Sequence, residues 1–200
     1  MKKLILGVFL IASCSLPCFC DSPITSTYFC EAYFEIEIIR DAEKSGVMTN
    51  TFAEFLSGDH PIEQKVALIN ALSWDINGKK NFSIYENFLK KRYGKRKFGL
   101  SKCTADELLC LGYLKEMDDY FSTEAALKIL DIAIKKQPNS YTFQMIRSLV
   151  VAQRELDLDW CAAFEACNTV EQDATLQRDM KQEAVDIIWE YMSLYEDSCK

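Results

Sequence analysis

Residues 104–138 read TADELLCLGYLKEMDDYFSTEAALKILDIAIKKQP, and this stretch decides the fold class. Thr104 and, three residues later, Glu107 form the capping-box pattern that begins a helix. Ser122 is placed to begin a second helix, which must end before Pro138 because proline lacks the amide hydrogen that a helix interior needs. The stretch therefore predicts two antiparallel helices joined by a short turn.

The same hairpin resembles a unit of the tetratricopeptide repeat family. Its matching positions are Leu108, Leu111 and Gly112 in the first helix and Ala126, Leu130, Ala133 and Pro138 in or after the second. The two helices are offset by two residues more than in that family, and the next period places Trp160 and Cys167 where small residues belong. The resemblance covers about 35 residues and implies peptide or protein binding on a concave face, although a stable array needs about three repeats. We therefore expect one such hairpin within an irregular helical stack.

The rest of the chain carries a similar pattern, in which apolar residues recur at helical spacing. Residues 34–38 also alternate as a strand would, but the length of the first segment favours a helix. Further helices are expected over residues 28–44, 50–57, 61–75, 82–93, 140–155, 159–168 and 174–197. The prediction is an all-α fold, an irregular stack of antiparallel helical hairpins stapled by disulfides. It forms a single domain over residues 21–200, with a candidate subdivision near 94–103.

The first twenty residues have the pattern of a bacterial secretory signal. Lys2 and Lys3 give a basic start, and an apolar run follows from Leu4 to Ala12. This run of about nine residues is too short to cross a bilayer core of roughly 30 Å. We therefore expect an exported protein.

Two processing sites compete within that segment. Cys18 and Cys20 occupy the small-residue positions that signal peptidase reads, which predicts a signal peptide of residues 1–20. The run Ile11-Ala12-Ser13-Cys14 instead resembles the box of bacterial lipoproteins, so Cys14 is a candidate for lipidation. Either outcome places the protein outside the cytoplasm, free in the periplasm or anchored to a membrane by lipid.

Six cysteines remain after residues 1–20 are removed, an even number that suits disulfides in an oxidising compartment. These disulfide candidates are Cys30, Cys103, Cys110, Cys161, Cys167 and Cys199. If the close pairs 103/110 and 161/167 each lie along one helix, their Cα atoms are roughly 9–10 Å apart, beyond the limit of about 7 Å for a disulfide. Long-range bridges are therefore favoured, and about ten connectivities stay open. No Cys-x-x-Cys pair points to zinc.

The chain is acidic except for one segment. Removing Lys2 and Lys3 with the signal leaves 21 basic and 30 acidic residues, a net charge of −9, which argues against a nucleic-acid partner. Seven bases nevertheless gather within thirteen residues: Lys90, Lys91, Arg92, Lys95, Arg96, Lys97 and Lys102. One interpretation is a contact with lipid headgroups, a glycan or an acidic protein. The other is a helix C-terminus and a solvated loop.

Candidate catalytic residues are sparse. His60 is the only histidine, which excludes a Ser-His-Asp triad elsewhere in the chain and a histidine-rich metal site. Glu31 with Glu35, and Glu37 with Asp41, are carboxylate pairs that could divide acid and base roles, although their spacing is also typical of a solvated helix face. No glycine-rich phosphate loop occurs, and we expect no cofactor or metal.

Aromatic residues are frequent in the last third, where they suit a core or a binding groove: Tyr141, Phe143, Trp160, Phe164, Trp189, Tyr191 and Tyr195. Together the patterns favour an exported, non-enzymatic helical module that binds another protein or peptide. One alternative is a periplasmic immunity or inhibitor protein that neutralises a toxin. Another is a small hydrolase that uses two carboxylates.

Overall fold

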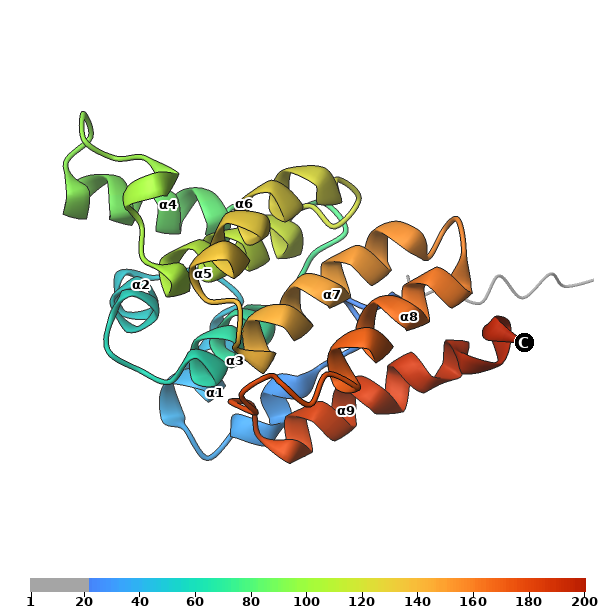
Figure 1. Ribbon diagram of the computed structural model, residues 1–200. Coiled ribbons are helices and arrows are strands. Elements are labelled where there is room, and N and C mark those ends of the chain that lie inside the picture. Colours follow the sequence, from blue (N-terminus) through green and yellow to red (C-terminus); the bar gives the residue numbers. More distant parts are fainter. Residues whose placement is uncertain (1–21) are drawn as a thin grey trace, which may run out of the picture.

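The computed structural model describes residues 22–200, and the all-α fold class is confirmed for them (Figure 1). The α-helices of this part are α1 (Glu37–Ser45), α2 (Asn50–Ser57), α3 (Ile62–Leu72), α4 (Asn81–Tyr93), α5 (Ala105–Asp118), α6 (Thr123–Lys136), α7 (Tyr141–Glu155), α8 (Trp160–Glu171) and α9 (Gln182–Met192). Three short 3-10 helices accompany them: η1 (Phe29–Tyr33), η2 (Leu100–Lys102) and η3 (Ser193–Cys199). The predicted signal and the lipidation candidate Cys14 lie outside the described residues.

Helices α5 and α6 form the antiparallel hairpin that residues 104–138 predict (Figure 1). The capping box is confirmed: the Glu107 amide donates to Thr104 Oγ1 at 3.1 Å, and the Thr104 amide donates to Glu107 Oε2 at 2.9 Å. A Cβ atom placed on Gly112 would lie 2.6 Å from Leu130 Cγ, so the missing side chain lets the two helices approach closely. The tetratricopeptide resemblance itself stays a prediction.

Helices α7 and α8 make the next hairpin, and α9 returns alongside them towards the first elements of the chain (Figure 1). Buried apolar residues from the whole described part belong to one hydrophobic cluster, which includes Leu89 before the 94–103 loop and Leu111 after it. The fold is therefore a stack of helical hairpins around a shared core.

The single helix predicted over residues 28–44 is wrong, because the segment divides into η1 and α1 with a short break between them. Element η1 buries Phe29 and Tyr33, whereas α1 buries Ile39 and Ala42. In one continuous helix with 3.6 residues per turn, these two pairs would face different sides. The break lets both pairs reach the core.

The helix predicted over residues 174–197 is also wrong at both ends, because α9 covers only its middle and η3 its last turns. The first part instead forms a turn and then a single β-bridge between Gln177 and Ser140, at the start of α7. The Tyr141 amide donates to the Gln177 carbonyl at 3.0 Å, and the Thr142 amide donates to Asp179 Oδ1 at 2.8 Å. The segment satisfies amides that begin α7, and this role is incompatible with a helix of its own.

One disulfide staples the fold by joining Cys161, at the start of α8, to Cys199, at the end of η3, with their Cα atoms 4.8 Å apart. The other candidates are buried free thiols, which corrects the expectation that all six cysteines pair. They are Cys30, Cys103, Cys110 and Cys167. Each thiol packs within the core as a small apolar group. Burial raises the pKa of Cys103 to about 11 and that of Cys167 to about 12, so these thiols stay protonated.

Candidate functional site: an acidic–aromatic pocket

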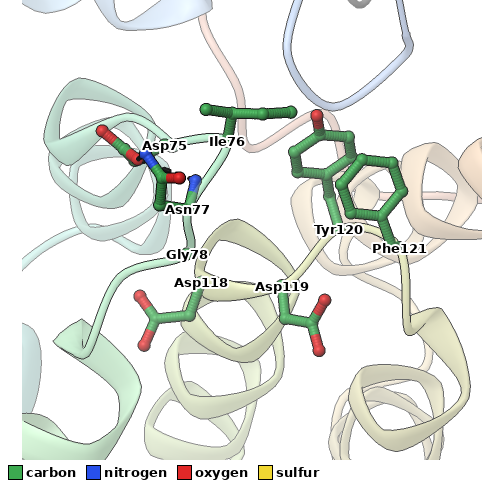
Figure 2. A pocket seen from close by; sticks show the side chains of 8 residues that line it. All are labelled: Asp75, Ile76, Asn77, Gly78, Asp118, Asp119, Tyr120 and Phe121. Atoms are coloured by element: carbon green, nitrogen blue, oxygen red, sulfur yellow. Dashed lines mark hydrogen bonds between the residues drawn. The ribbon is translucent and has the colours of Figure 1, made fainter.

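A pocket opens where two loops distant in sequence meet, the loop between α3 and α4 and the turn between α5 and α6 (Figure 2). It encloses about 340 Å³. We call it the acidic–aromatic pocket, and its lining residues are Asp75, Ile76, Asn77, Gly78, Asp118, Asp119, Tyr120 and Phe121.

The first loop leaves α3 earlier than the sequence suggests. The helix ends at Leu72, not near Asp75, because Ser73 adopts a positive φ of 57° that turns the chain outward. Lys79 Nζ then donates to the Leu72 carbonyl at 2.6 Å and to the Gly46 carbonyl at 3.0 Å, closing the end of α3. These bonds hold the loop in one conformation against the helix bundle.

Asp118 fixes the two loops to each other. Its carboxylate accepts the amides of Asn81 at 3.1 Å and Phe82 at 2.9 Å, and so caps α4 from the end of α5. Burial raises the pKa of Asp118, an effect opposed by these two backbone hydrogen bonds. Gly78, with φ at 78°, passes so close that an added Cβ would lie 3.0 Å from the Asp118 carbonyl oxygen. Asp118 is therefore a structural residue of the pocket floor.

Aromatic side chains form one wall of the pocket. The rings of Tyr120 and Phe121 lie with their centroids 4.3 Å apart, and Trp74 meets Tyr120 edge to face at 5.1 Å. Figure 2 shows Ile76 at the rim between the Asp75 loop and these rings. Phe121 is 70% exposed and Ile76 is 58% exposed, so two large apolar side chains of this pocket face solvent.

Two carboxylates of the pocket face solvent. Asp75 Oδ1 accepts the Asn77 amide at 2.8 Å, which shapes its own loop and leaves the side chain exposed. Asp119 is exposed, and within residues 22–200 its carboxylate has neither a hydrogen bond nor an ion pair. Asp118 and Asp119 point to different sides of the turn (Figure 2). Asp119 therefore gives the pocket lining an unpaired carboxylate, which Figure 2 shows apart from the rings of the aromatic wall.

Glu116, in the last turn of α5, is fully buried, and neither of its carboxyl oxygens has a hydrogen-bond partner within the described residues. Burial first, and then the charge of Asp119, raises the pKa of Glu116 to about 9. The side chain is therefore a neutral acid at pH 7. It does not line the pocket and does not reach solvent, so it has no access to a substrate there.

The carboxylate pairs that the sequence singles out are not brought together as an acid–base site. Glu35 lies in the break after η1 and forms an ion pair with Lys181, which lowers its pKa, while Glu31 stays in η1. Glu37 and Asp41 are exposed on α1. These four acids therefore lie on the solvated surface of the protein, which is the alternative to an acid–base site.

His60 and the late aromatics have largely structural surroundings. His60 is exposed and stacks on Phe55, with ring centroids 4.0 Å apart. Tyr141 and Phe143 are buried, whereas Trp160 is exposed and contacts Tyr195 edge to face at 6.1 Å. Phe164 and Trp189 line one pocket and Tyr191 lines another, so within residues 22–200 the late aromatics are divided between separate places.

The seven bases lie together, as their spacing suggests, at the end of α4 and in the loop that follows it. They lie at and beyond the last turn of α4, whereas Asp118 of the acidic–aromatic pocket contacts the first turn of that helix. Sequence reasoning missed that pocket. Its one available signal was the aromatic pair Tyr120-Phe121 in a turn, a position where polar residues are usual.

Among residues 22–200, no cluster of His, Cys, Asp and Glu has the arrangement of a metal site. None of the helices in that part has the length and apolar character needed to cross a membrane. Comparison with protein-family models, with curated proteins and with solved structures gives no match.

Proposed function

We propose that this protein is a non-enzymatic binding module that holds a basic, arginine-bearing segment of another protein in the acidic–aromatic pocket. The observation that carries the proposal is that the exposed side chains of Phe121 and Ile76 line the same pocket as Asp119, whose carboxylate has no hydrogen bond or ion pair within residues 22–200. A guanidinium is planar and stacks on aromatic faces while it donates to carboxylates. Arginine therefore matches both halves of the pocket, and an aliphatic neighbour would cover Ile76.

Preorganisation of the two loops supports binding. The Asp118 cap and the bonds of Lys79 hold the pocket walls in place before a partner arrives. Binding to such a site costs less conformational entropy than binding to a mobile loop. The exposed aromatic residue of the wall, Phe121, also belongs to a residue class that is enriched in protein interfaces.

We further propose that the module acts outside the cytoplasm. The Cys161–Cys199 disulfide supports this location, because disulfides persist in oxidising compartments. The four free thiols are compatible with it, since each is buried.

The test is a titration with a panel of short peptides in which arginine is flanked by varied apolar residues. Each peptide is compared with a counterpart that carries neutral citrulline in place of arginine. We expect backbone amide resonances of residues 75–78 and 118–121 to shift, with arginine peptides binding about tenfold more tightly than citrulline ones. Equal binding of both series, or shifts elsewhere only, would contradict the proposal.

Variants sharpen the same experiment. Phe121→Ala and Asp119→Asn should each weaken binding by about tenfold, equivalent to about 1.4 kcal/mol. The matched control is a second exposed acid–aliphatic pair, Asp157 and Leu158, of which Leu158 is 79% exposed. Asp157→Asn and Leu158→Ala should leave binding unchanged. Weakening by the control substitutions to the same degree would show that the surface as a whole, and not the pocket, attracts the peptides.

A further inference from the structure

The basic segment at the end of α4 is the second unusual surface of this acidic protein. Two of its seven bases are engaged: Lys90 pairs with Glu86 at 2.5 Å, and Arg92 donates to the Ser57 carbonyl at 3.0 Å. The remaining five are exposed and form no ion pair within residues 22–200. We call these five the basic tip, and they are Lys91, Lys95, Arg96, Lys97 and Lys102.

The basic tip projects from the helix bundle. Figure 1 shows the end of α4 and the following loop extending beyond the neighbouring helices at the upper left. The helix stops at Gly94, whose φ is 83°, and the amides of Lys97 and Phe98 fold back onto the Gly94 carbonyl at 2.8 and 3.0 Å. The Phe98 ring lies under Lys90, 5.7 Å from its ammonium nitrogen. The loop is thus a compact turn that carries its charges outward.

Three of the acids near the tip are already occupied. Glu86 pairs with Lys90, Glu107 accepts the hydroxyl of Tyr93 at 2.7 Å, and Asp106 pairs with the buried Lys65 at 2.7 Å. Charges further away act weakly, because the Debye length is about 8 Å at physiological ionic strength. The tip is therefore locally positive although the whole chain carries a net charge of −7.

We propose that the basic tip docks the protein on the surface of an anionic phospholipid bilayer. A convex turn has no walls with which to enclose a small anion, but it can touch a flat surface that offers many negative charges at once. Each lysine or arginine near such a surface contributes about a fivefold gain in partitioning. Four of the free bases, Lys91, Lys95, Arg96 and Lys97, lie on the projecting end of α4 and its loop, and Lys102 follows in η2. Together they supply the cluster of charges that this mode of binding needs.

The docking surface and the acidic–aromatic pocket are at opposite ends of α4. The pocket touches the start of the helix through Asp118, and the basic tip begins at its last turn. A helix of 13 residues spans roughly 20 Å at 1.5 Å per residue. The protein can therefore contact a bilayer with one end of α4 while a partner occupies the pocket at the other. The docking proposal stands independently of the proposed function.

The experiment measures sedimentation with phosphatidylcholine vesicles and with vesicles that contain about one third phosphatidylglycerol, at low and high salt. The tip variant is Lys95→Glu/Arg96→Glu/Lys97→Glu. The control is Lys44→Glu/Lys80→Glu/Lys128→Glu, which changes the net charge equally at dispersed exposed positions. All chains carry the same N-terminus, and circular dichroism checks their folding.

We expect salt-sensitive binding of the unaltered chain and of the control to the anionic vesicles only, and at least a 100-fold loss for the tip variant. An equal loss in both variants would overturn the proposal, since net charge alone would then explain binding. Binding to neutral vesicles that survives in the tip variant would also overturn it. Displacement of the protein from the vesicles by millimolar glycerol phosphate would overturn the proposal, because it would identify a free anion as the ligand. Tip-dependent binding to an acidic protein, without binding to vesicles, would overturn it as well.

Discussion

Replacing Glu116 with glutamine should stabilise this protein near neutral pH and leave its stability almost unchanged in mild acid. The carboxyl group is fully buried without a hydrogen-bond partner among the described residues, and its pKa in the folded chain is raised to about 9. In the unfolded chain a glutamate ionises with a pKa of about 4.3. Between these two values the folded protein holds a proton that the unfolded chain has released.

The pH dependence follows from that difference in bound protons. Stability falls as pH rises through the window from about 4.3 to about 9, by about 1.4 kcal/mol per pH unit, and becomes flat above the folded pKa. From pH 5 to pH 8 the loss is about 4 kcal/mol, a large fraction of the 5–15 kcal/mol typical of a domain. Glutamine has nearly the same shape and does not ionise, so Glu116→Gln removes this loss.

The assay is urea unfolding of the unaltered chain and of Glu116→Gln at pH 5, 6, 7 and 8, with linear extrapolation to water. We expect the stability difference between the two proteins to grow with pH. Glu183→Gln, at an exposed glutamate of α9, is the control and should give a nearly constant difference. A difference for Glu116→Gln that does not change with pH would refute the reasoning, because it would mean that the carboxyl group ionises as readily in the folded protein as in water.

Three further substitutions test the packing of the fold. Gly112→Ala should cost about 1–3 kcal/mol in urea unfolding, because the new methyl would meet Leu130 at 2.6 Å; a stabilised variant would show that the α5–α6 contact is loose. Cys161→Ser with Cys199→Ser should lower the free energy of unfolding by about 2–4 kcal/mol, and added reductant should have no effect on this variant but the same effect on the unaltered chain. Asp118→Ala should cost about 1–2 kcal/mol and speed hydrogen exchange in the first turn of α4; unchanged exchange there would mean that another group caps the helix.

Local signals predicted the α5–α6 hairpin well because every cause lies within the hairpin itself. Thr104 and Glu107 satisfy each other's amides, and Pro138 follows the end of α6. In such a segment, tertiary contacts agree with the local conformational preference and do not change it. The all-α class was predictable for the same reason, since helical spacing of apolar residues is read within one turn or two.

The elements that were mispredicted depend on distant partners. The buried Tyr33 hydroxyl donates to Glu63 Oε2 at 2.8 Å and accepts the Lys181 amide at 3.1 Å, and these contacts join η1, α3 and the start of α9. A periodic pattern cannot show that residues 148 positions apart will share a hydrogen bond. The break after η1 and the late start of α9 are consequences of such contacts.

The sequence by itself determined that this chain is helical, where its central hairpin begins and ends, and that seven bases gather in one acidic protein. Only the tertiary structure decided that Cys161 pairs with Cys199 and that Asp118 caps a helix beginning at Asn81. It also decided that Asp119, Phe121 and Ile76, from two separate loops, line one pocket. The physical reason is the distance along the chain over which each kind of interaction acts. Caps and helical periodicity act over a few residues, whereas a binding surface forms only when packing of the core brings separate loops together.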